Sequence, residues 1–349
     1  MGKVSIICPL YNKKNFISQT IQSVLQQSSD YWELIVVDDG STDGSYELVY
    51  EMSLNEPRIK LLRRSDFNRE LRGANICRNI GVQRSTGNYV FFLDADDLLM
   101  PYCVEQRISY VSKNPGYNLY VFNVAYCKGK DAVPYAKQFP QRATIEAYNK
   151  AKDKRVHFLR LFLKFDLPWH TSGPLWEHSF FCSCGGFNPD FQRLQDPEIH
   201  SRILMDENVR LKYAMGETNY DILHRNDEER TVWTQQEFLR KRLEAITQYI
   251  NTFVPMVIEK YPNSFVKQMQ GYLIEAEKIS YRYLRGNRDN ENSKEVKSLL
   301  ASVYRGKNTL FLIDWKFKAL RAICSIFSNK LLIKMKFLGL FLALYKKLI

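Results

Sequence analysis

Hydrophobic positions in the first 126 residues alternate between two patterns. Short apolar runs, such as residues 4–8, predict buried strands. Apolar residues at helical spacing, such as Ile17, Ile21 and Val24, predict helices between those strands. The expected strands cover residues 4–8, 34–37, 59–62, 89–93 and 117–126, and the expected helices cover residues 16–27, 45–54, 76–85 and 101–113. This alternation predicts an α/β fold, with a mostly parallel sheet that helices cover on both faces.

The pattern changes in the rest of the chain. Residues 129–188 are less regular and rich in aromatic side chains, and helices are expected over residues 235–253 and 264–285. A chain of 349 residues accommodates one large domain and a smaller one. We therefore predict a main domain over residues 1–230, a helical extension over 231–309 and a tail over 310–349.

Positive charge is concentrated in that tail. The whole chain has a formal charge of +12, and residues 310–349 contain eight Lys and Arg against one acidic residue. Nucleic-acid binding usually needs a basic stripe on the folded body, so we expect no nucleic-acid partner. Apolar residues such as Phe317 and Leu320 share one helix face of the tail, and Lys318 and Arg321 share another. This basic amphipathic pattern predicts binding to an anionic membrane surface. Packing on the body or on a second copy in a homo-oligomer is the alternative.

Cysteine usage and the chain's N-terminal residues indicate the compartment. The seven cysteines are an odd number and include no C-x-x-C pair, which is typical of a reducing environment. The longest apolar run, residues 337–345, is too short to span a bilayer. The first residues do not resemble a secretory signal. We therefore predict a cytoplasmic protein that is peripherally associated with the membrane.

Polar and acidic residues directly follow three of the expected strands. Tyr11 comes after the first, Asp38 and Asp39 after the second, and the sequence D-A-D-D at residues 94–97 after the fourth. In an open parallel sheet, ligands bind beyond the carboxyl ends of the strands. Acidic groups that crowd together there repel one another unless a cation lies between them. Carboxylate oxygens suit Mg²⁺ or Mn²⁺, which commonly also bind substrate phosphates.

Four segments at these positions resemble the motifs of inverting family 2 glycosyltransferases with the GT-A fold. They are V-S-I-I-C-P-L-Y-N at residues 4–12, V-V-D-D-G-S-T-D at 36–43, R-N-I-G at 78–81 and G-N-Y-V-F-F-L-D-A-D-D at 87–97. Their order and spacing match the family over about the first third of the chain. The resemblance implies a Rossmann-like sheet that binds a nucleotide-diphosphate sugar.

The resemblance also implies roles in donor binding. Tyr11 and Asp39 would hold the base, expected to be uracil, and Pro9 is a candidate for the same site. Arg78 would meet a phosphate, and Asp94 would contact the ribose or the metal. Two alternatives stay open, because Pro9 can simply shape its loop and Arg78 can simply pair with an acid.

A divalent cation is the cofactor that the resemblance implies. Asp96 would bind Mn²⁺ or Mg²⁺ between the two donor phosphates. His224 follows a short apolar run, where family members often place a basic group near the metal, so it is a second candidate ligand. Asp97 is expected to cap the following helix. Asp38 and Asp43 are expected to organise the turn after the second strand.

A catalytic base is expected downstream. The segment Cys184 to Glu198 resembles the family's G-G-F segment followed by an acidic pair, although Gln195 replaces the first acid. Asp196 keeps the position of the base that would deprotonate the acceptor hydroxyl. Because Asp196 precedes Pro197, a role as helix cap is the alternative, and Glu198 is the alternative base.

Aromatic residues upstream of that segment resemble the loop on the acceptor side. Trp169 and Trp176 would form a wall for a sugar face, and packing in the core is the alternative for both.

Together these residues predict a metal-dependent, inverting glycosyltransferase. It would move a sugar from a nucleotide sugar, expected to be a UDP-sugar, to an acceptor hydroxyl of a surface polysaccharide or lipid-linked glycan. A non-catalytic, membrane-associated nucleotide-sugar-binding protein is one alternative, for which Gln195 leaves room. A sugar nucleotidyltransferase is another, but it would need a glycine-rich basic loop after the first strand. No G-x-G-x-x-G segment follows a strand, which argues against a dinucleotide oxidoreductase.

Overall fold

The computed structural model describes residues 2–128, 133–139, 149–214, 216–225, 235–286 and 291–312. The chain divides into two compact units, which are described separately below. The first unit comprises residues 1–158 and 168–231, and the second comprises residues 159–167 and 232–349.

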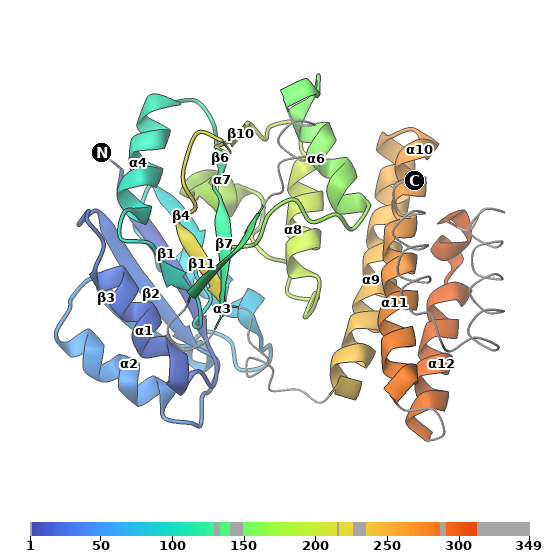
Figure 1. The fold of residues 1–349 in the computed structure, drawn as a ribbon, viewed down its shortest axis with the longest axis horizontal. Helices are drawn as coiled ribbons and strands as arrows, with labels where there is room; N and C mark the ends of the chain where they lie inside the picture. The colour runs from blue at the N-terminus through green and yellow to red at the C-terminus, as the bar shows by residue number, and fades with distance from the viewer. Residues whose placement is uncertain are drawn as a thin grey trace. The chain divides into compact units, whose positions relative to one another are not determined.

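A seven-stranded sheet is the centre of the first unit (Figure 1). In sheet order its strands are β10 (Leu211–Tyr213), β6 (Leu119–Val121), β9 (Pro174–Glu177), β4 (Tyr89–Phe92), β1 (Val4–Leu10), β2 (Trp32–Asp38) and β3 (Ile59–Arg63). Neighbouring strands pair in parallel except at β9, which runs antiparallel to both β4 and β6. The predicted α/β class with a mostly parallel sheet is therefore confirmed.

Helices alternate with these strands along the chain. They are α1 (Lys14–Leu25), α2 (Ser45–Leu54), the 3-10 helix η1 (Arg64–Asp66), α3 (Ala74–Gln83), α4 (Cys103–Lys113), α6 (Lys154–Leu163), α7 (His178–Ser183) and α8 (Gln195–Leu204). The part of α6 from Leu159 onward belongs to the second unit. The four helices expected before residue 114 are present, and α2 has the predicted bounds.

Helices pack on both faces of the main sheet. Val4, Ile6 and Cys8 are alternate residues of β1, and they share one core cluster with apolar residues of α1, α2 and α4. Ile7 points to the opposite face, where a Cβ built on Gly81 of α3 would lie 2.3 Å from its Cγ2. The glycine of the R-N-I-G motif therefore lets α3 approach the sheet closely.

The strand expected over residues 117–126 is two strands in two sheets. Its second half is β7 (Val124–Lys128), which joins a four-stranded sheet of order β5-β11-β7-β8. The other members are β5 (Leu98–Leu99), β8 (Val133–Phe139) and β11 (Ile222–Arg225). The chain changes sheets at Asn123, whose side-chain amide donates to Thr218 O at 2.9 Å. The apolar run hides this break, because β6 and β7 are both largely buried.

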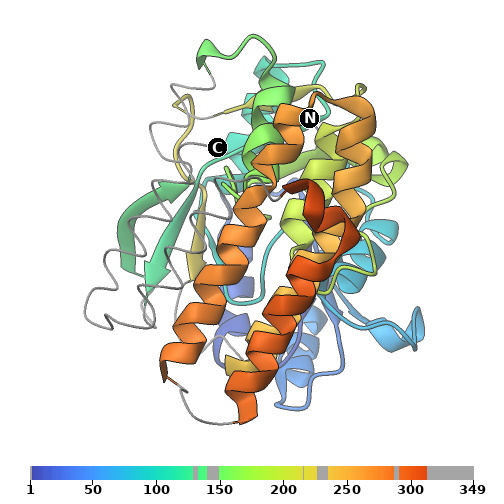
Figure 2. The ribbon, with the colours of Figure 1, turned by 90° about the vertical axis from the view of Figure 1, so that its right-hand side faces the viewer.

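The second unit is helical (Figure 2). Its elements are α9 (Gln235–Lys260), α10 (Asn263–Gln268), α11 (Gln270–Gly286), α12 (Glu291–Arg305) and the 3-10 helix η3 (Lys307–Leu312). Tyr249 of α9 stacks on Tyr272 of α11 with ring centroids 4.0 Å apart. The helix expected over residues 264–285 is interrupted at Met269, and the helix expected over 235–253 continues to the end of α9.

Membrane attachment was predicted from the tail, of which residues 313–349 lie outside the described part of the chain. Among the described helices, none is both long enough and apolar enough to cross a bilayer.

Candidate active site

The predicted site residues gather at one edge of the main sheet. Strands β1, β2 and β4 are parallel neighbours, so the loops that follow them leave the sheet at the same edge. Strand β9 runs the other way, and its first residue, Pro174, pairs with Val121 at the end of β6. The segment His170–Gly173 before β9 therefore reaches this edge too.

Turn formation occupies two of the acids after β2. Asp38 accepts hydrogen bonds from the backbone N–H groups of Gly40 at 2.9 Å and Ser41 at 3.1 Å. Asp43 accepts one from the N–H of Ser45 at 2.9 Å. The predicted turn role of Asp38 and Asp43 is confirmed.

Asp39 and Tyr11 lie on either side of one arginine. The buried carboxylate of Asp39 accepts hydrogen bonds from Arg64 and from the N–H of Gly73, the latter at 2.9 Å. Arg72 donates to the backbone oxygen of Asp39 at 2.6 Å, and its guanidinium lies 5.7 Å from the ring centroid of Tyr11. The Tyr11 side chain is 40% exposed, so its ring is accessible to a ligand. Pro9, the third predicted nucleotide contact, is half-buried within β1.

Arg78 of α3 links the D-A-D-D segment to the start of α8. Its guanidinium donates to Asp94 Oδ1 at 2.7 Å and to Gln195 Oε1 at 2.9 Å. It also lies 5.3 Å from the ring centroid of Phe187, in the G-G-F segment. Gln195 thus keeps a hydrogen bond at the position where the family usually has an acid, with one negative charge fewer beside Arg78.

Asp96 is paired with a lysine. Its buried carboxylate lies 2.9 Å from Lys13 Nζ, and its backbone oxygen accepts a hydrogen bond from Arg225 Nε at 3.0 Å. The structure does not place Asp96 among the side chains that converge as a candidate metal site in the described residues. Its role as a metal ligand stays a prediction.

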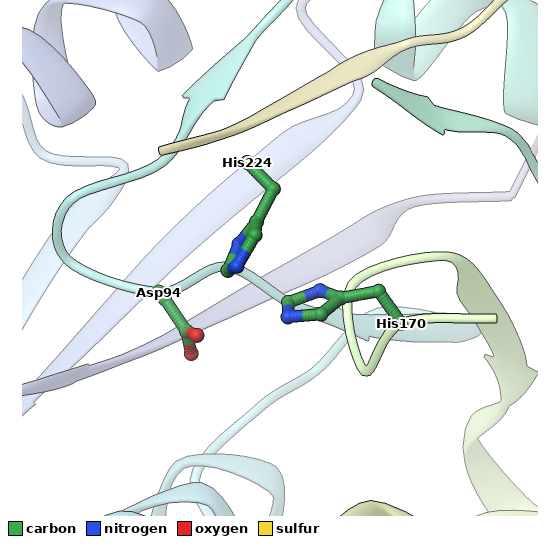
Figure 3. Close-up of side chains that lie close together, drawn as sticks. All are labelled: Asp94, His170 and His224. Atoms are coloured by element: carbon green, nitrogen blue, oxygen red, sulfur yellow. The ribbon is translucent and has the colours of Figure 1, made fainter. Parts of the chain in front are cut away.

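A carboxylate of the D-A-D-D segment and two imidazoles converge (Figure 3). Asp94, His170 and His224 each offer one ligand atom, and these atoms all lie within 4.8 Å of one another. Asp94 comes from the loop after β4, His170 from the segment before β9, and His224 from β11. The two imidazole centroids are 3.9 Å apart. His224 was predicted for this role, whereas sequence reasoning missed His170 as a ligand.

Asp97 orients one of these imidazoles and does not cap a helix, contrary to the prediction. The following helix, α4, starts only at Cys103. Asp97 is fully buried and accepts hydrogen bonds from His224 Nδ1 at 2.8 Å and from the N–H of Arg225 at 3.0 Å. A carboxylate acceptor requires the proton on Nδ1, which leaves the Nε2 lone pair of His224 for another partner.

The surroundings of His170 favour its neutral form. Burial, reinforced by the nearby His224, lowers the pKa of His170 to about 4, although Asp196 and Asp94 oppose this shift. A neutral imidazole has the lone pair that metal coordination requires.

Asp196 lies next to this cluster. Its carboxylate accepts a hydrogen bond from the hydroxyl of Thr171, the residue after His170. The cap position of α8 is Leu194, in a left-handed conformation with φ of 58°, and no side chain caps the helix. Asp196 therefore does not act as a helix cap here. The alternative base, Glu198, is buried and paired with Arg202 at 2.6 Å.

The two tryptophans do not form an acceptor wall, contrary to that prediction. Trp169 is 2% exposed and Trp176 is 1% exposed, so neither presents a ring face to a ligand. Both pack on the buried His200, with ring centroids at 5.4 and 5.8 Å. His200 Nδ1 donates to the backbone oxygen of Asp196 at 2.7 Å. Core packing, the alternative for both tryptophans, supports the helix that positions Asp196.

Residues 5–171 match the model of the family described as "Glycosyl transferase family 2". The resemblance of the motifs to family 2 glycosyltransferases is therefore confirmed over this part of the chain. Among curated relatives, the UDP-Glc:alpha-D-GlcNAc-diphosphoundecaprenol beta-1,3-glucosyltransferase WfgD of Escherichia coli is 41% identical over 111 residues. That match covers 32% of this chain and 42% of the relative. Matches to such relatives cover 16 to 44% of their length, and several are named as glycosyltransferases.

Solved structures confirm the GT-A fold. The S. aureus TarS 1–349 structure in complex with UDP-GlcNAc has a TM-score of 0.62 and 15% identity, over 91% of this chain and 86% of that chain. The mannosyltransferase PcManGT of Pyrobaculum calidifontis, in complex with GDP-Man and Mn²⁺, has a TM-score of 0.51 and 16% identity. This similarity covers 98% of this chain and 85% of that chain. At these identities the likeness concerns the fold.

Proposed function

We propose that this chain is a metal-dependent, inverting glycosyltransferase that uses a nucleotide-diphosphate sugar. The observation that supports this most directly is the placement of Asp94, His170 and His224 beside Asp196, at the edge of a family 2 domain. Residues 170 and 171 are adjacent, so one loop borders both the cation site and the proposed base. Such a site can bind the leaving diphosphate and activate the acceptor together.

The nucleotide side of the site comprises Pro9, Tyr11 and Asp39. The ring of Tyr11 stacks on the base, and Asp39, held by Arg64 and Gly73, accepts a hydrogen bond from it. A uracil base is supported by a relative whose name includes UDP-Glc and by a neighbour of the same fold in complex with UDP-GlcNAc. Arg78 reaches the phosphates beside Asp94.

The residues at the cation site fit a divalent transition metal. Imidazole nitrogens suit transition metals, and carboxylate oxygens suit Mn²⁺ and Mg²⁺, so Asp94, His170 and His224 together suit Mn²⁺ better than Mg²⁺. A neighbour of the same fold was solved with Mn²⁺. When bound, the cation supplies positive charge against the charge that develops on the leaving diphosphate. Asp96 is a further candidate ligand, and one of its carboxylate oxygens is paired with Lys13.

Asp196 acts as the base. Thr171 orients its carboxylate, which takes the proton of the acceptor hydroxyl as that oxygen attacks the anomeric carbon. The bond from that carbon to the nucleoside diphosphate breaks on the opposite face, so the configuration inverts. A positioned base of this kind contributes about 10²–10⁴-fold to the rate.

The acceptor is a hydroxyl of a surface polysaccharide or of a lipid-linked glycan. The name of WfgD, which includes a diphosphoundecaprenol-linked acceptor, supports this choice. The tail over residues 310–349 attaches the protein peripherally to the cytoplasmic face of the membrane, and the domain boundaries lie near residues 230 and 309. Cosedimentation with phosphatidylglycerol vesicles, by the full chain but not by residues 1–309, tests the attachment. Equal cosedimentation of both would contradict it.

The test of the catalytic assignment measures UDP release from UDP-glucose and UDP-N-acetylglucosamine, with Mn²⁺ and with or without a lipid-linked glycan. Asp196→Asn is expected to lower turnover by about 10²–10⁴-fold. It should leave the thermal stabilisation by UDP and Mn²⁺ unchanged, because Asp196 does not bind either. Glu198→Gln is the comparison for the alternative base. Near-normal turnover in Asp196→Asn would reject the assignment, and binding of UDP without turnover in the unaltered chain would favour the non-catalytic alternative.

A further inference from the structure

Arg107 of α4 is a fully buried arginine outside the site just described. Its guanidinium binds Asp221 through two parallel hydrogen bonds, Nε to Oδ2 at 2.7 Å and Nη2 to Oδ1 at 2.8 Å. Nη2 also donates to the backbone oxygen of Ser172 at 3.1 Å. One planar group therefore holds two segments that are 49 residues apart in the sequence.

These two segments are the ones that bear the paired imidazoles. Ser172 comes two residues after His170, and its hydroxyl lies 3.1 Å from His170 Nδ1. Asp221 directly precedes β11, three residues before His224. Arg107 does not belong to the cluster itself, yet its three acceptor contacts join the loop of one histidine to the strand of the other.

Stability is a weak explanation for this ion pair. Burying two charges is costly, and replacing a buried pair by apolar residues of similar volume is often neutral or stabilising. The pair lies among aromatic rings, with the guanidinium 4.4 Å from the centroid of Phe91 and 5.0 Å from that of Phe122. Apolar side chains could fill this space, but they could not fix a geometry as a planar donor fork does.

We propose that Arg107 is a positioning residue for the cation site. Arg107 sets the separation of His170 and His224. This inference rests on the proposed function, because it assumes that the two imidazoles bind a divalent cation. Other contacts also restrain the segments: the N–H of Asp221 donates to Asn123 O at 3.2 Å, and the N–H of Phe122 donates to Gly173 O at 3.0 Å. Loss of Arg107 should therefore loosen the cation site without unfolding the domain.

The test uses the full chain with Arg107→Met and Asp221→Leu together, so that no buried charge is left unpaired. Mn²⁺ binding is measured by electron paramagnetic resonance of the free ion, and folding is measured by thermal melting. The expected result is a dissociation constant for Mn²⁺ about tenfold higher or more, since residues that orient metal ligands typically contribute 10–100-fold to affinity. The melting temperature should stay close to that of the unaltered chain.

Glu33→Gln is the matched control. Glu33 is buried in the same unit and accepts hydrogen bonds from Ser5 and Lys60 at 2.7 and 2.9 Å, but it has no link to the histidine segments. This variant should bind Mn²⁺ as the unaltered chain does. If Arg107 had only a structural role, the double variant would have a lower melting temperature and an unchanged Mn²⁺ affinity.

Unchanged Mn²⁺ affinity in a folded double variant would overturn the inference. If that variant does not fold, Arg107→Lys takes its place, because an ammonium keeps the charge but cannot make the parallel bonds. Arg107→Lys should weaken Mn²⁺ binding in the same direction, and normal affinity there would overturn the inference as well. Absence of Mn²⁺ binding in the unaltered chain would instead overturn the proposed metal role, and this inference with it.

Discussion

The nucleotide side and the cation side of the proposed site are built in different ways. On the nucleotide side, Tyr11 and Asp39 directly follow neighbouring parallel strands, β1 and β2. On the cation side, His170 precedes the antiparallel strand β9, and His224 lies in a strand of the second sheet. The first side therefore depends on short local motifs, and the second on contacts between distant segments.

Burial differs between the two sides as well. Tyr11 is 40% exposed, whereas the carboxylate of Asp97 that orients His224 is fully buried. Substitution of an exposed ring has local consequences. Substitution of a buried polar group also affects the groups that are hydrogen-bonded to it. We therefore expect changes on the two sides to separate nucleotide affinity from metal affinity.

The largest effect is expected for His224→Ala. Removing a proposed direct ligand should weaken Mn²⁺ binding by more than about 100-fold, because orienting residues alone contribute about 10–100-fold. Electron paramagnetic resonance of free Mn²⁺ measures this, with His178→Ala as the control histidine. UDP binding without metal should not change, and its loss would contradict the separation of the two sides.

A smaller effect is expected for Asp97→Asn. The amide oxygen can still accept from one of its two donors, but the charged acceptor of His224 Nδ1–H is lost. Mn²⁺ affinity should fall by about 10–100-fold. Titration calorimetry measures the Mn²⁺ affinity, and a melting curve shows whether the variant is folded. Normal affinity in a folded variant would show that Asp97 does not orient His224.

Tyr11→Ala should affect the nucleotide side of the site alone. Loss of base stacking costs about 1 kcal/mol or more, so UDP affinity should fall by about fivefold. Mn²⁺ binding should be normal. Tyr50→Ala is the control, because Tyr50 is similarly exposed, at 51%, on α2. A drop in Mn²⁺ affinity for Tyr11→Ala would mean that the two sides are coupled.

Glu33→Gln should have the smallest effect on either ligand and is expected to act on stability. Burial alone would raise the pKa of Glu33, but hydrogen bonds from Ser5, Lys60 and Thr86 outweigh it and lower the pKa to about 2. A lowered carboxyl pKa stabilises the fold above the unfolded pKa of about 4.3, and this gain is lost as the pH falls towards 2. Urea unfolding should show a larger difference in stability between variant and parent at pH 7 than at pH 2. An equal difference at both would contradict the shifted pKa.

Prediction from sequence succeeded where local pattern and structure coincide. Strands β1 to β4 are short apolar runs, and helix α2 has the predicted bounds, because burial on one or both faces imposes a period that can be read along the chain. The motif residues at the ends of β1, β2 and β4 were found for the same reason. Asp38 and Asp43 act within a few residues of their own positions, so their turn role was also visible.

Only the tertiary structure decided which distant residues meet. The apolar pattern predicts a strand at residues 117–126 but not that it divides between two sheets, because pairing partners are not local. The antiparallel course of β9 brings His170 to the cation side, and the pairing of β11 with β7 aligns His224 with it. The local pattern predicts a helix cap at Asp97 because the partner of its carboxylate, His224, lies 127 residues away. By itself the sequence determined the strand-end motifs and their family resemblance, whereas long-range packing determined the imidazole pair, its buried supports and the burial of the two tryptophans.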